Sequence, residues 1–275
     1  MAQKAHVFDR LLRQDKLKTM WCSGCGNGIV MQALVRAIDK AGLDPDKVVV
    51  VAGIGCSCRA NGYMNVCGIH TNHGRAIAYA TGVKMANPDL HVIVVTGDGD
   101  CTSIGGNHFI HGARRNIDMT VVVFNNSNYG MTGGQFSPTT PYDAKTKTSI
   151  YGNIDPNFDI SILAKASGAT YVARSTTYHA SMLTEQLTNA INHNGFSVVE
   201  AMCDCPTLFG RFNKQGDAAE MLLNWKKAAV PVKKAENMTE DELQGKVVIG
   251  EFVNRSDRRE YTDIYEDVIK RAKES

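Results

Sequence analysis

The sequence predicts an α/β protein built on an open, mostly parallel sheet with helices on both faces. Three short β-branched runs carry this prediction: Val48 to Ala52, His91 to Val95 and Thr120 to Phe124. Their apolar character is typical of strands that are buried on both faces. Helix-length segments separate them, and such alternation of strands and crossover helices is the pattern of a parallel sheet.

The helices and the later strands follow from periodicity and stop signals. Apolar residues recur at helical spacing over residues 27 to 41, and Gly42 supplies a stop. The segments between the first three strands are long enough for crossover helices. After Asn126 a turn-rich stretch precedes a renewed α/β pattern. The expected helices are 74–86, 104–114, 159–167 and 179–192, and the expected later strands are 170–173 and 197–202.

Beyond Pro206 the periodicity weakens and charged residues become more frequent. We therefore expect one domain over residues 1–210 and an irregular C-terminal extension over 211–275 that faces a partner protein. A solvated and partly mobile tail is an equally acceptable interpretation of this composition.

Bulk composition excludes several classes of function. With 275 residues, 43% of them hydrophobic and 21% charged, the chain reads as globular. No apolar run approaches the roughly 20 residues of a membrane helix, and the N-terminus lacks the apolar core of a secretory signal, so we expect a cytoplasmic protein without membrane contact. A formal charge of +2 is too low to favour nucleic acid as a partner.

Two predicted loops at neighbouring strand ends carry candidate metal ligands. The strand ending at Val95 leads into Thr96-Gly97-Asp98-Gly99-Asp100, and the next ends in Asn125-Asn126-Ser127-Asn128. Glycines let the backbone approach a diphosphate, and Mg²⁺ prefers oxygen ligands shared with phosphate. Asp98, the Asn126 amide oxygen and the Asn128 carbonyl are the expected protein ligands. A lone Gly-Asp-Gly is usually only a tight turn, and the second loop is what favours a cofactor.

The chain has eight cysteines, and their spacing suggests a metal site. Cys22 and Cys25 form a Cys-x₂-Cys at a Gly-rich turn, which serves zinc, iron-sulfur clusters or dithiol chemistry. No second such pair follows at the distance of a zinc ribbon, so further ligands must be distant in sequence. Cys56 and Cys205 both follow predicted strands and can reach the same sheet edge.

Six segments together give the sequence a specific resemblance. In order they are WCSGCGNG, GIGCSCR, IHTNHGRAIAYATG, GDGD, FNNSNYGMTGG and CDCPT, within residues 18 to 213. They resemble the β subunit of 2-oxoacid:ferredoxin oxidoreductases, and the Gly-Asp-Gly with a downstream Asn resembles the bipartite motif of thiamine diphosphate enzymes. The resemblance implies a thiamine diphosphate-binding fold and a [4Fe-4S] cluster held by Cys22, Cys25, Cys56 and Cys205, with Cys203 the first substitute.

The resemblance also implies which residues contact the thiamine cofactor. His73 would donate to a phosphate oxygen, although a structural role for His70 and His73 is the alternative. Arg59 stands where some relatives have Lys, and it could pair with a substrate carboxylate. Cys58, Cys67, Cys101 and Cys203 are expected to be small buried residues. The expected cofactor contacts are Ile54, Gly55, Cys56, Ser57, His73, Gly99, Asp100, Gly130 and Met131.

One expected catalytic group is missing from the chain. Thiamine enzymes use a Glu on the aminopyrimidine ring, and this sequence has no Glu before Glu185. Glu185 and Glu200 are predicted to lie away from the cofactor loops. The resemblance therefore implies that an α subunit supplies the Glu, in a heterodimer that pairs further, and that the isolated chain is inactive.

The implied activity is oxidative decarboxylation of a 2-oxo acid with coenzyme A, with electrons passing through the cluster to ferredoxin. 2-Oxoglutarate, giving succinyl-CoA and CO₂ and possibly run in reverse, is favoured because NNSNYGMTGGQFSPTTP resembles that group; pyruvate, branched-chain acids and indolepyruvate are alternatives. Arg114, Arg115 or surface lysines could dock an acidic ferredoxin, or could form an ordinary solvated face. A structural zinc protein and a redox sensor using Cys22 and Cys25 are the alternatives from other classes.

Overall fold

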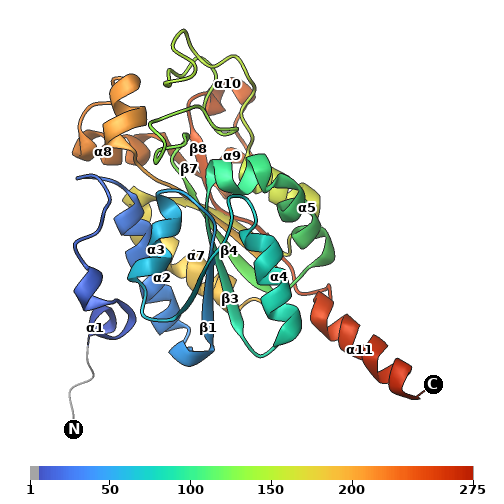
Figure 1. The fold of residues 1–275 in the computed structure, drawn as a ribbon. Helices are drawn as coiled ribbons and strands as arrows, with labels where there is room; N and C mark the ends of the chain where they lie inside the picture. Colours follow the sequence, from blue (N-terminus) through green and yellow to red (C-terminus); the bar gives the residue numbers. More distant parts are fainter. Residues whose placement is uncertain (1–5, 275) are drawn as a thin grey trace.

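The strands form an eight-stranded sheet in a computed structural model that describes residues 6–274 (Figure 1). Their order is β2-β1-β3-β4-β6-β5-β8-β7, and every neighbouring pair is parallel except β5 with β8. This confirms the predicted mostly parallel sheet. The strand bounds are β1 Val48–Ala52, β2 Cys67–His70, β3 His91–Gly97, β4 Met119–Asn125, β5 Tyr171–Thr176, β6 Phe196–Met202, β7 Ala229–Pro231 and β8 Val247–Asn254.

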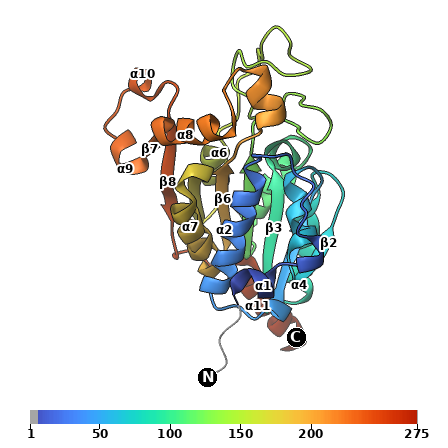
Figure 2. The same cartoon turned by 90° about the vertical axis from the view of Figure 1, so that its left-hand side faces the viewer.

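Helices cover both faces of this sheet. Figure 2 shows α2 and α7 on one side of the strands and α4 on the other. Within residues 6–274, none of the helices combines the length and apolar character that a membrane crossing requires. The helix bounds are α1 Val7–Leu11, α2 Asn27–Lys40, α3 Ala60–Tyr63, α4 Ala76–Ala86, α5 Gly106–Arg115, α6 Ile160–Ser167, α7 Ala180–Asn192, α8 Ala218–Ala228, α9 Val232–Ala235, α10 Glu240–Leu243 and α11 Tyr261–Glu274.

Two hydrophobic cores, one on each face, explain why the central strands are apolar along their whole length. Successive side chains of a strand point to opposite faces. Val48, Val50 and Ala52 therefore pack with the α2 and α7 side, while Val49 and Val51 pack with the α4 and α5 side. Both sets of side chains are buried, so these strands have no solvent-facing positions at which polar residues could alternate with apolar ones.

The strand register brings the predicted loops to one edge of the sheet. Ala52 pairs with Val95, Gly97 pairs with Phe124, and Asn125 pairs with Met202. These residues lie at the carboxyl ends of β1, β3, β4 and β6, where open α/β sheets bind their ligands. The turn-rich segment 127–157 extends above the same edge (Figure 1).

The expectation of an irregular C-terminal extension is wrong. The part of the chain after residue 210 contains α8 to α11, and β8 joins the main sheet antiparallel to β5. Only Ile249 is buried among the residues of β8. Its other positions are exposed or half-exposed, so its sequence shows neither a continuous apolar run nor a regular apolar–polar alternation. β2 was missed for a similar reason, because it is an exposed edge strand. A division of the chain at residue 210 stays a prediction.

Candidate functional site

The residues predicted to contact the thiamine cofactor or Mg²⁺ line one cavity of about 150 Å³ at the carboxyl edge of the sheet. β3 ends at Gly97 and runs through Asp98 into a π-helical turn at Asp100–Ile104, while β4 ends at Asn125. The turn at Ser57–Arg59 adds the third side. The lining includes Ile54, Gly55, Cys56, Ser57, His73, Asp98, Gly99, Asp100, Asn126, Asn128, Gly130 and Met131.

Asp98 presents a buried carboxylate to this cavity. Its side chain accepts hydrogen bonds at Oδ2 from the hydroxyl of Ser137 at 2.5 Å and from that of Thr139 at 2.6 Å. Burial raises the pKa of Asp98 to about 6, and the two hydroxyls oppose that rise. A buried carboxylate is costly without a partner of opposite charge, and a bound cation would remove that cost.

The Asn126–Asn128 turn supplies further oxygen atoms. The side-chain oxygen of Asn126 is buried and has no hydrogen-bond partner among the described residues. Ser127 adopts a left-handed φ of 59°, and its backbone N–H donates to the side-chain oxygen of Asn125 at 3.1 Å. An orphaned amide oxygen beside a buried carboxylate is the donor set of a hard cation, so these residues fit Mg²⁺.

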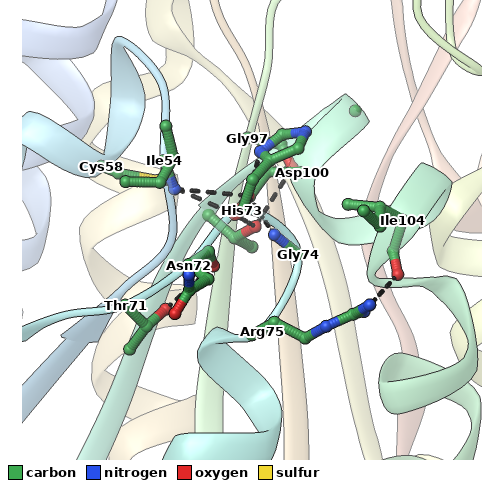
Figure 3. Close-up of polar contacts among 12 residues, drawn as sticks. Ile54, Cys58, Thr71, Asn72, His73, Gly74, Arg75, Gly97, Asp100 and Ile104 are labelled. Carbon is green, nitrogen blue, oxygen red and sulfur yellow. Dashed lines mark hydrogen bonds and ion pairs between the residues drawn. The ribbon is translucent and has the colours of Figure 1, made fainter.

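Asp100 also lines the cavity and connects the loops that carry Ile54 and Gly74 to its own (Figure 3). Its Oδ1 accepts from the backbone N–H of Gly74 at 2.7 Å and from that of Ile54 at 3.3 Å, and its Oδ2 accepts from the Thr96 hydroxyl at 2.6 Å. A Cβ on Gly53 would lie 1.9 Å from Oδ2 of Asp100, so only glycine allows this approach. Asp100 therefore holds the cofactor loops together.

His73 reaches the same carboxylate from the loop before α4. Its Nδ1 lies 2.7 Å from Oδ1 of Asp100, a close polar contact that holds the ring beside this carboxylate although its angles are not those of a hydrogen bond. The ring packs edge-on against Tyr129, with centroids 5.9 Å apart, and the Tyr129 hydroxyl donates to the Gly99 carbonyl at 3.3 Å. The imidazole is thus fixed at the mouth of the cavity with its side chain 37% exposed.

A second cavity, of about 220 Å³, contains the four predicted cluster ligands. Cys22 and Cys25 come from the loop before α2, Cys56 from the turn after β1, and Cys205 from the segment after β6. The indole N–H of Trp21 donates to the Cys56 carbonyl at 2.7 Å and so ties the first loop to the second. The structure brings these distant cysteines together as predicted.

The four thiols are free, and two of them, Cys25 and Cys56, lie where an isolated thiolate is disfavoured. Burial raises the pKa of Cys25 to about 12, and the neighbouring Cys205, Cys56 and Cys22 add to the increase. Burial, Cys205 and Cys22 also raise the pKa of Cys56. Thiolates here need a compensating cation, and iron supplies it in Cys₄ clusters. This arrangement fits a [4Fe-4S] cluster. Within residues 6–274, no three His, Cys, Asp or Glu side chains are arranged to hold a single metal ion.

The remaining cysteines lie outside the cluster cavity. Cys203 is buried, and its thiol donates to the side-chain oxygen of Asn27 at 3.6 Å. Cys58 and Cys101 are buried as expected, but Cys67 is exposed on the edge strand β2, so its assignment as a small buried residue is wrong.

Several residues around Asp98 and the Asn126–Asn128 turn were not singled out from sequence. Ser137, Thr139 and Thr140 form a hydroxyl brace: the first two donate to Asp98, and the third donates to the Ser127 carbonyl at 2.7 Å. These hydroxyls come from an irregular loop, so neither residue periodicity nor motif spacing could have predicted their contacts with the Asp98 carboxylate or with Ser127. The only available signal was the run of hydroxyl residues in Ser-Pro-Thr-Thr.

Neither Glu185 nor Glu200 is placed to activate the thiamine cofactor. Glu185 is exposed on α7. Glu200 is nearer the cofactor loops than expected, because it is buried on β6 and accepts from the Asn125 amide at 2.8 Å and from Arg174 Nε at 2.7 Å. Neither Glu lines the cofactor cavity. Arg59 also lies outside that lining, on a separate cavity, so its pairing with a substrate carboxylate stays a prediction.

Sequence comparison places this chain within a known group. The family described as "Thiamine pyrophosphate enzyme, C-terminal TPP binding domain" matches residues 25–201. The 2-oxoglutarate synthase subunit KorB of Methanocaldococcus jannaschii is 50% identical over 249 residues, which cover 90% of this chain and 92% of that protein. The corresponding Archaeoglobus fulgidus subunit is 51% identical over 241 residues, with 88% and 86% covered.

A solved structure resembles nearly the whole chain. The 2-oxoglutarate:ferredoxin oxidoreductase from Magnetococcus marinus, with 2-oxoglutarate, coenzyme A and succinyl-CoA bound, superposes with a TM-score of 0.86. It is 31% identical, and the match covers 98% of this chain and 92% of that chain.

Proposed function

The chain belongs to the β subunits of 2-oxoacid:ferredoxin oxidoreductases, in the 2-oxoglutarate synthase group, and from this premise we propose that it holds thiamine diphosphate, Mg²⁺ and one [4Fe-4S] cluster. The whole enzyme oxidises 2-oxoglutarate with coenzyme A to succinyl-CoA and CO₂ and reduces ferredoxin. Its relatives' names and the ligands of the Magnetococcus marinus structure support this substrate.

The observation that carries the proposal is the common wall between the two cavities. Cys56, Asn126, Gly130 and Met131 line both the cofactor cavity and the four-cysteine cavity. A Cβ on Gly130 would contact Cys56 Sγ at 3.5 Å and Cys205 Sγ at 3.9 Å, so glycine keeps the space between the cavities open. A cofactor in one cavity and a cluster in the other would be separated only by this wall, and electrons could pass between them directly.

Each part of the site has a distinct task in this proposal. When bound, thiamine diphosphate supplies the carbanion chemistry of decarboxylation, and the cluster accepts single electrons. Asp98, Asn126 and Asn128 hold Mg²⁺ on the diphosphate. His73 donates to a phosphate oxygen, and Asp100 positions His73 and the Ile54 backbone. Cys22, Cys25, Cys56 and Cys205 bind the cluster.

The activating carboxylate comes from an α subunit in this proposal. The carboxylates that line the cofactor cavity are Asp98 and Asp100, and both are engaged in positioning contacts. No Glu lines this cavity, and the sequence has none before Glu185. The αβ unit is therefore the smallest active form.

The test is anaerobic turnover by the chain co-purified with its α subunit. Reduction of a viologen acceptor is followed with coenzyme A and either 2-oxoglutarate or pyruvate. Turnover with 2-oxoglutarate and not pyruvate supports the proposal in full. Turnover with pyruvate alone would keep the reaction and overturn the substrate. A colourless, zinc-containing and inactive complex would contradict the proposal.

A further inference from the structure

A row of buried polar side chains crosses three neighbouring strands beside the proposed metal site. Arg174 on β5 is paired with Glu200 on β6, and Glu200 is paired in turn with Val123 on β4. Asn125 is two residues beyond Val123, so its side chain points to the same face of the sheet as that of Glu200. Arg174, Glu200 and Asn125 are 6%, 2% and 3% exposed. Charged groups at this depth require specific partners.

The two carboxylate oxygens of Glu200 have different partners. Oε2 accepts from Arg174 Nε at 2.7 Å and from the Ser161 hydroxyl at 2.9 Å. Oε1 accepts from the side-chain amide of Asn125 at 2.8 Å. Arg174 forms a second ion pair with Asp159. One oxygen of Glu200 therefore serves the ion pair, and the other serves Asn125.

The contact with Glu200 determines which way the Asn125 amide points. A carboxylate paired with a guanidinium accepts hydrogen bonds and has none to donate, so Asn125 must turn its NH₂ group toward Glu200. The amide oxygen then faces the Asn126–Asn128 turn, where it accepts from the Ser127 backbone N–H at 3.1 Å. Ser127 has a left-handed φ of 59°, a conformation that is uncommon outside glycine and needs such support.

This turn carries the orphaned Asn126 oxygen. Asn126 lines the cofactor cavity and also a further cavity of about 610 Å³. Asn125, Glu200 and Arg174 line only the latter, so they reach the turn from a side that the cofactor cavity does not include. We propose that Glu200 is a positioning residue of the magnesium site, which acts through the Asn125 amide to hold the Asn126 oxygen in place. This inference rests on the proposed Mg²⁺ and thiamine diphosphate site.

A purely structural ion pair is the competing explanation for Glu200. Buried ion pairs contribute little net stability, because the cost of removing both charges from water offsets their attraction. Arg174 also has Asp159 as a second acidic partner. A structural role requires a carboxylate beside Arg174, whereas a positioning role requires an acceptor directed at Asn125. An exchange of donor and acceptor separates the two roles.

Three variants of the αβ complex make this exchange. In Glu200→Gln, the new amide oxygen stays with Arg174 and its NH₂ group meets the NH₂ group of Asn125; a flipped Asn125 would then direct its NH₂ group at the Ser127 N–H. In Asn125→Asp, two carboxylates face each other. The double variant pairs the Gln NH₂ group with the Asp carboxylate and again presents an oxygen to Ser127.

The measurement is a calorimetric titration of Mg²⁺ into each complex, depleted of Mg²⁺ beforehand and supplied with thiamine diphosphate. Each single variant should bind Mg²⁺ about 10- to 100-fold more weakly than the wild type, the usual effect of losing a contact that orients a metal ligand. The double variant should recover most of the affinity, so that the two changes are strongly non-additive. Cluster absorbance should stay constant throughout, since neither residue lines the four-cysteine cavity.

Asp159→Asn is the matched control. It removes a carboxylate from Arg174 without touching Asn125, and asparagine can replace aspartate as the N-cap of α6. This variant should bind Mg²⁺ as the wild type does.

Three results would overturn the inference. The first is wild-type Mg²⁺ affinity in Glu200→Gln. The second is equal loss of affinity in Glu200→Gln and the double variant, which both lack the carboxylate beside Arg174. The third is a Glu200→Gln complex that fails to fold and that Asn125→Asp does not rescue. Failure of the proposed function is distinguishable from all three, because the wild-type complex would then bind thiamine diphosphate without Mg²⁺ or not at all.

Discussion

At the scale of single residues, the proposed magnesium site depends on two sets of groups, those that would contact the metal and those that hold its ligands in place. Asp98 and the Asn126 side chain provide oxygen atoms toward the cavity, and Ser137 and Thr139 hold the Asp98 carboxylate from behind. Such supporting hydrogen bonds orient metal ligands and set their affinity. The motif residues and the hydroxyl brace therefore form one functional unit.

Replacing Asp98 with Ala should remove the only proposed charged ligand of Mg²⁺. We expect Mg²⁺-dependent thiamine diphosphate binding by the αβ complex to weaken by more than about a hundred-fold, because loss of a ligand exceeds loss of a supporting contact. The cluster absorbance should remain, since Asp98 does not line the cluster cavity. Calorimetry and visible spectroscopy measure the two effects. Asp89→Ala, at an exposed carboxylate, is the control, and retained binding in Asp98→Ala would refute the ligand assignment.

Thr139→Val keeps the side-chain shape and removes the hydroxyl that donates to Asp98. We expect Mg²⁺ affinity to fall by about 10- to 100-fold, the usual effect of losing a supporting hydrogen bond at a metal site. Thr139→Ser restores the hydroxyl and should recover most of the affinity. Equal affinity for Mg²⁺ in the Val and Ser variants would show that the brace is only structural.

Cys205 and Cys203 offer a paired test of the cluster ligands. Cys205 lines the four-cysteine cavity, while Cys203 is buried against Asn27. Cys205→Ser should therefore lose or degrade the cluster, and Cys203→Ser should keep it, as measured by iron content and by absorbance. The reverse pattern would assign the wrong cysteine.

The metal motifs could be predicted from sequence at this scale, whereas the supporting residues could not. Asp98, Asn126 and the four cysteines stand at strand ends or in compact motifs, so their meeting follows from parallel topology. Thr139 contacts Asp98, and Glu200 contacts Asn125, only once a loop and a strand have packed in the folded chain, and sequence spacing does not contain these distances.

At the scale of elements, the C-terminal helix α8 supports the four-cysteine cavity. Gly24, between Cys22 and Cys25, has a positive φ of 76°, and a Cβ there would lie 2.3 Å from Cβ of Ala218 at the start of α8. The cysteine loop is thus packed directly against α8. The sequence showed the loop but not its support, because α8 lies in a segment whose weak periodicity resembles a tail.

Gly24→Ala should displace either α8 or the cysteine loop. We expect loss of cluster iron from the purified αβ complex, because the added methyl group collides with Ala218 and a left-handed backbone is unfavourable for alanine. Gly42→Ala is a matched control, since Gly42 has a φ of 68° and open space around its Cβ position. Equal iron content in the two variants would contradict a role for α8 in holding the loop.

The central strands show which parts of a fold are predictable. β1, β3 and β4 are buried on both faces, so nearly all their residues are apolar. Because such runs are easily recognised in a sequence, the predicted bounds of these strands lie close to the observed ones. β2 and β8 lie toward the sheet edges, and most of their side chains are exposed or half-exposed. Their sequences therefore show neither the continuous apolar run of a buried strand nor the alternation of a half-buried one. The central sheet was therefore predictable, and its edges were not.

At the scale of the whole molecule, our proposal gives this chain the electron-accepting part of a site that a partner subunit completes. The cofactor and cluster cavities share four lining residues. No Glu lines the cofactor cavity, which agrees with a division of labour between two subunits. Assembly with the α subunit is accordingly a condition of activity in our account.

The most direct test of the central claim is an anaerobic spectrum of the αβ complex, recorded before and after 2-oxoglutarate is added without an external acceptor. If thiamine diphosphate and the cluster occupy the two adjoining cavities, the visible absorbance of the cluster should bleach and a paramagnetic signal of the reduced cluster should appear. The same addition to the complex with Asp98→Ala should change neither. A cluster that stays oxidised while the wild-type complex releases CO₂ from 2-oxoglutarate would contradict direct electron transfer across the shared wall.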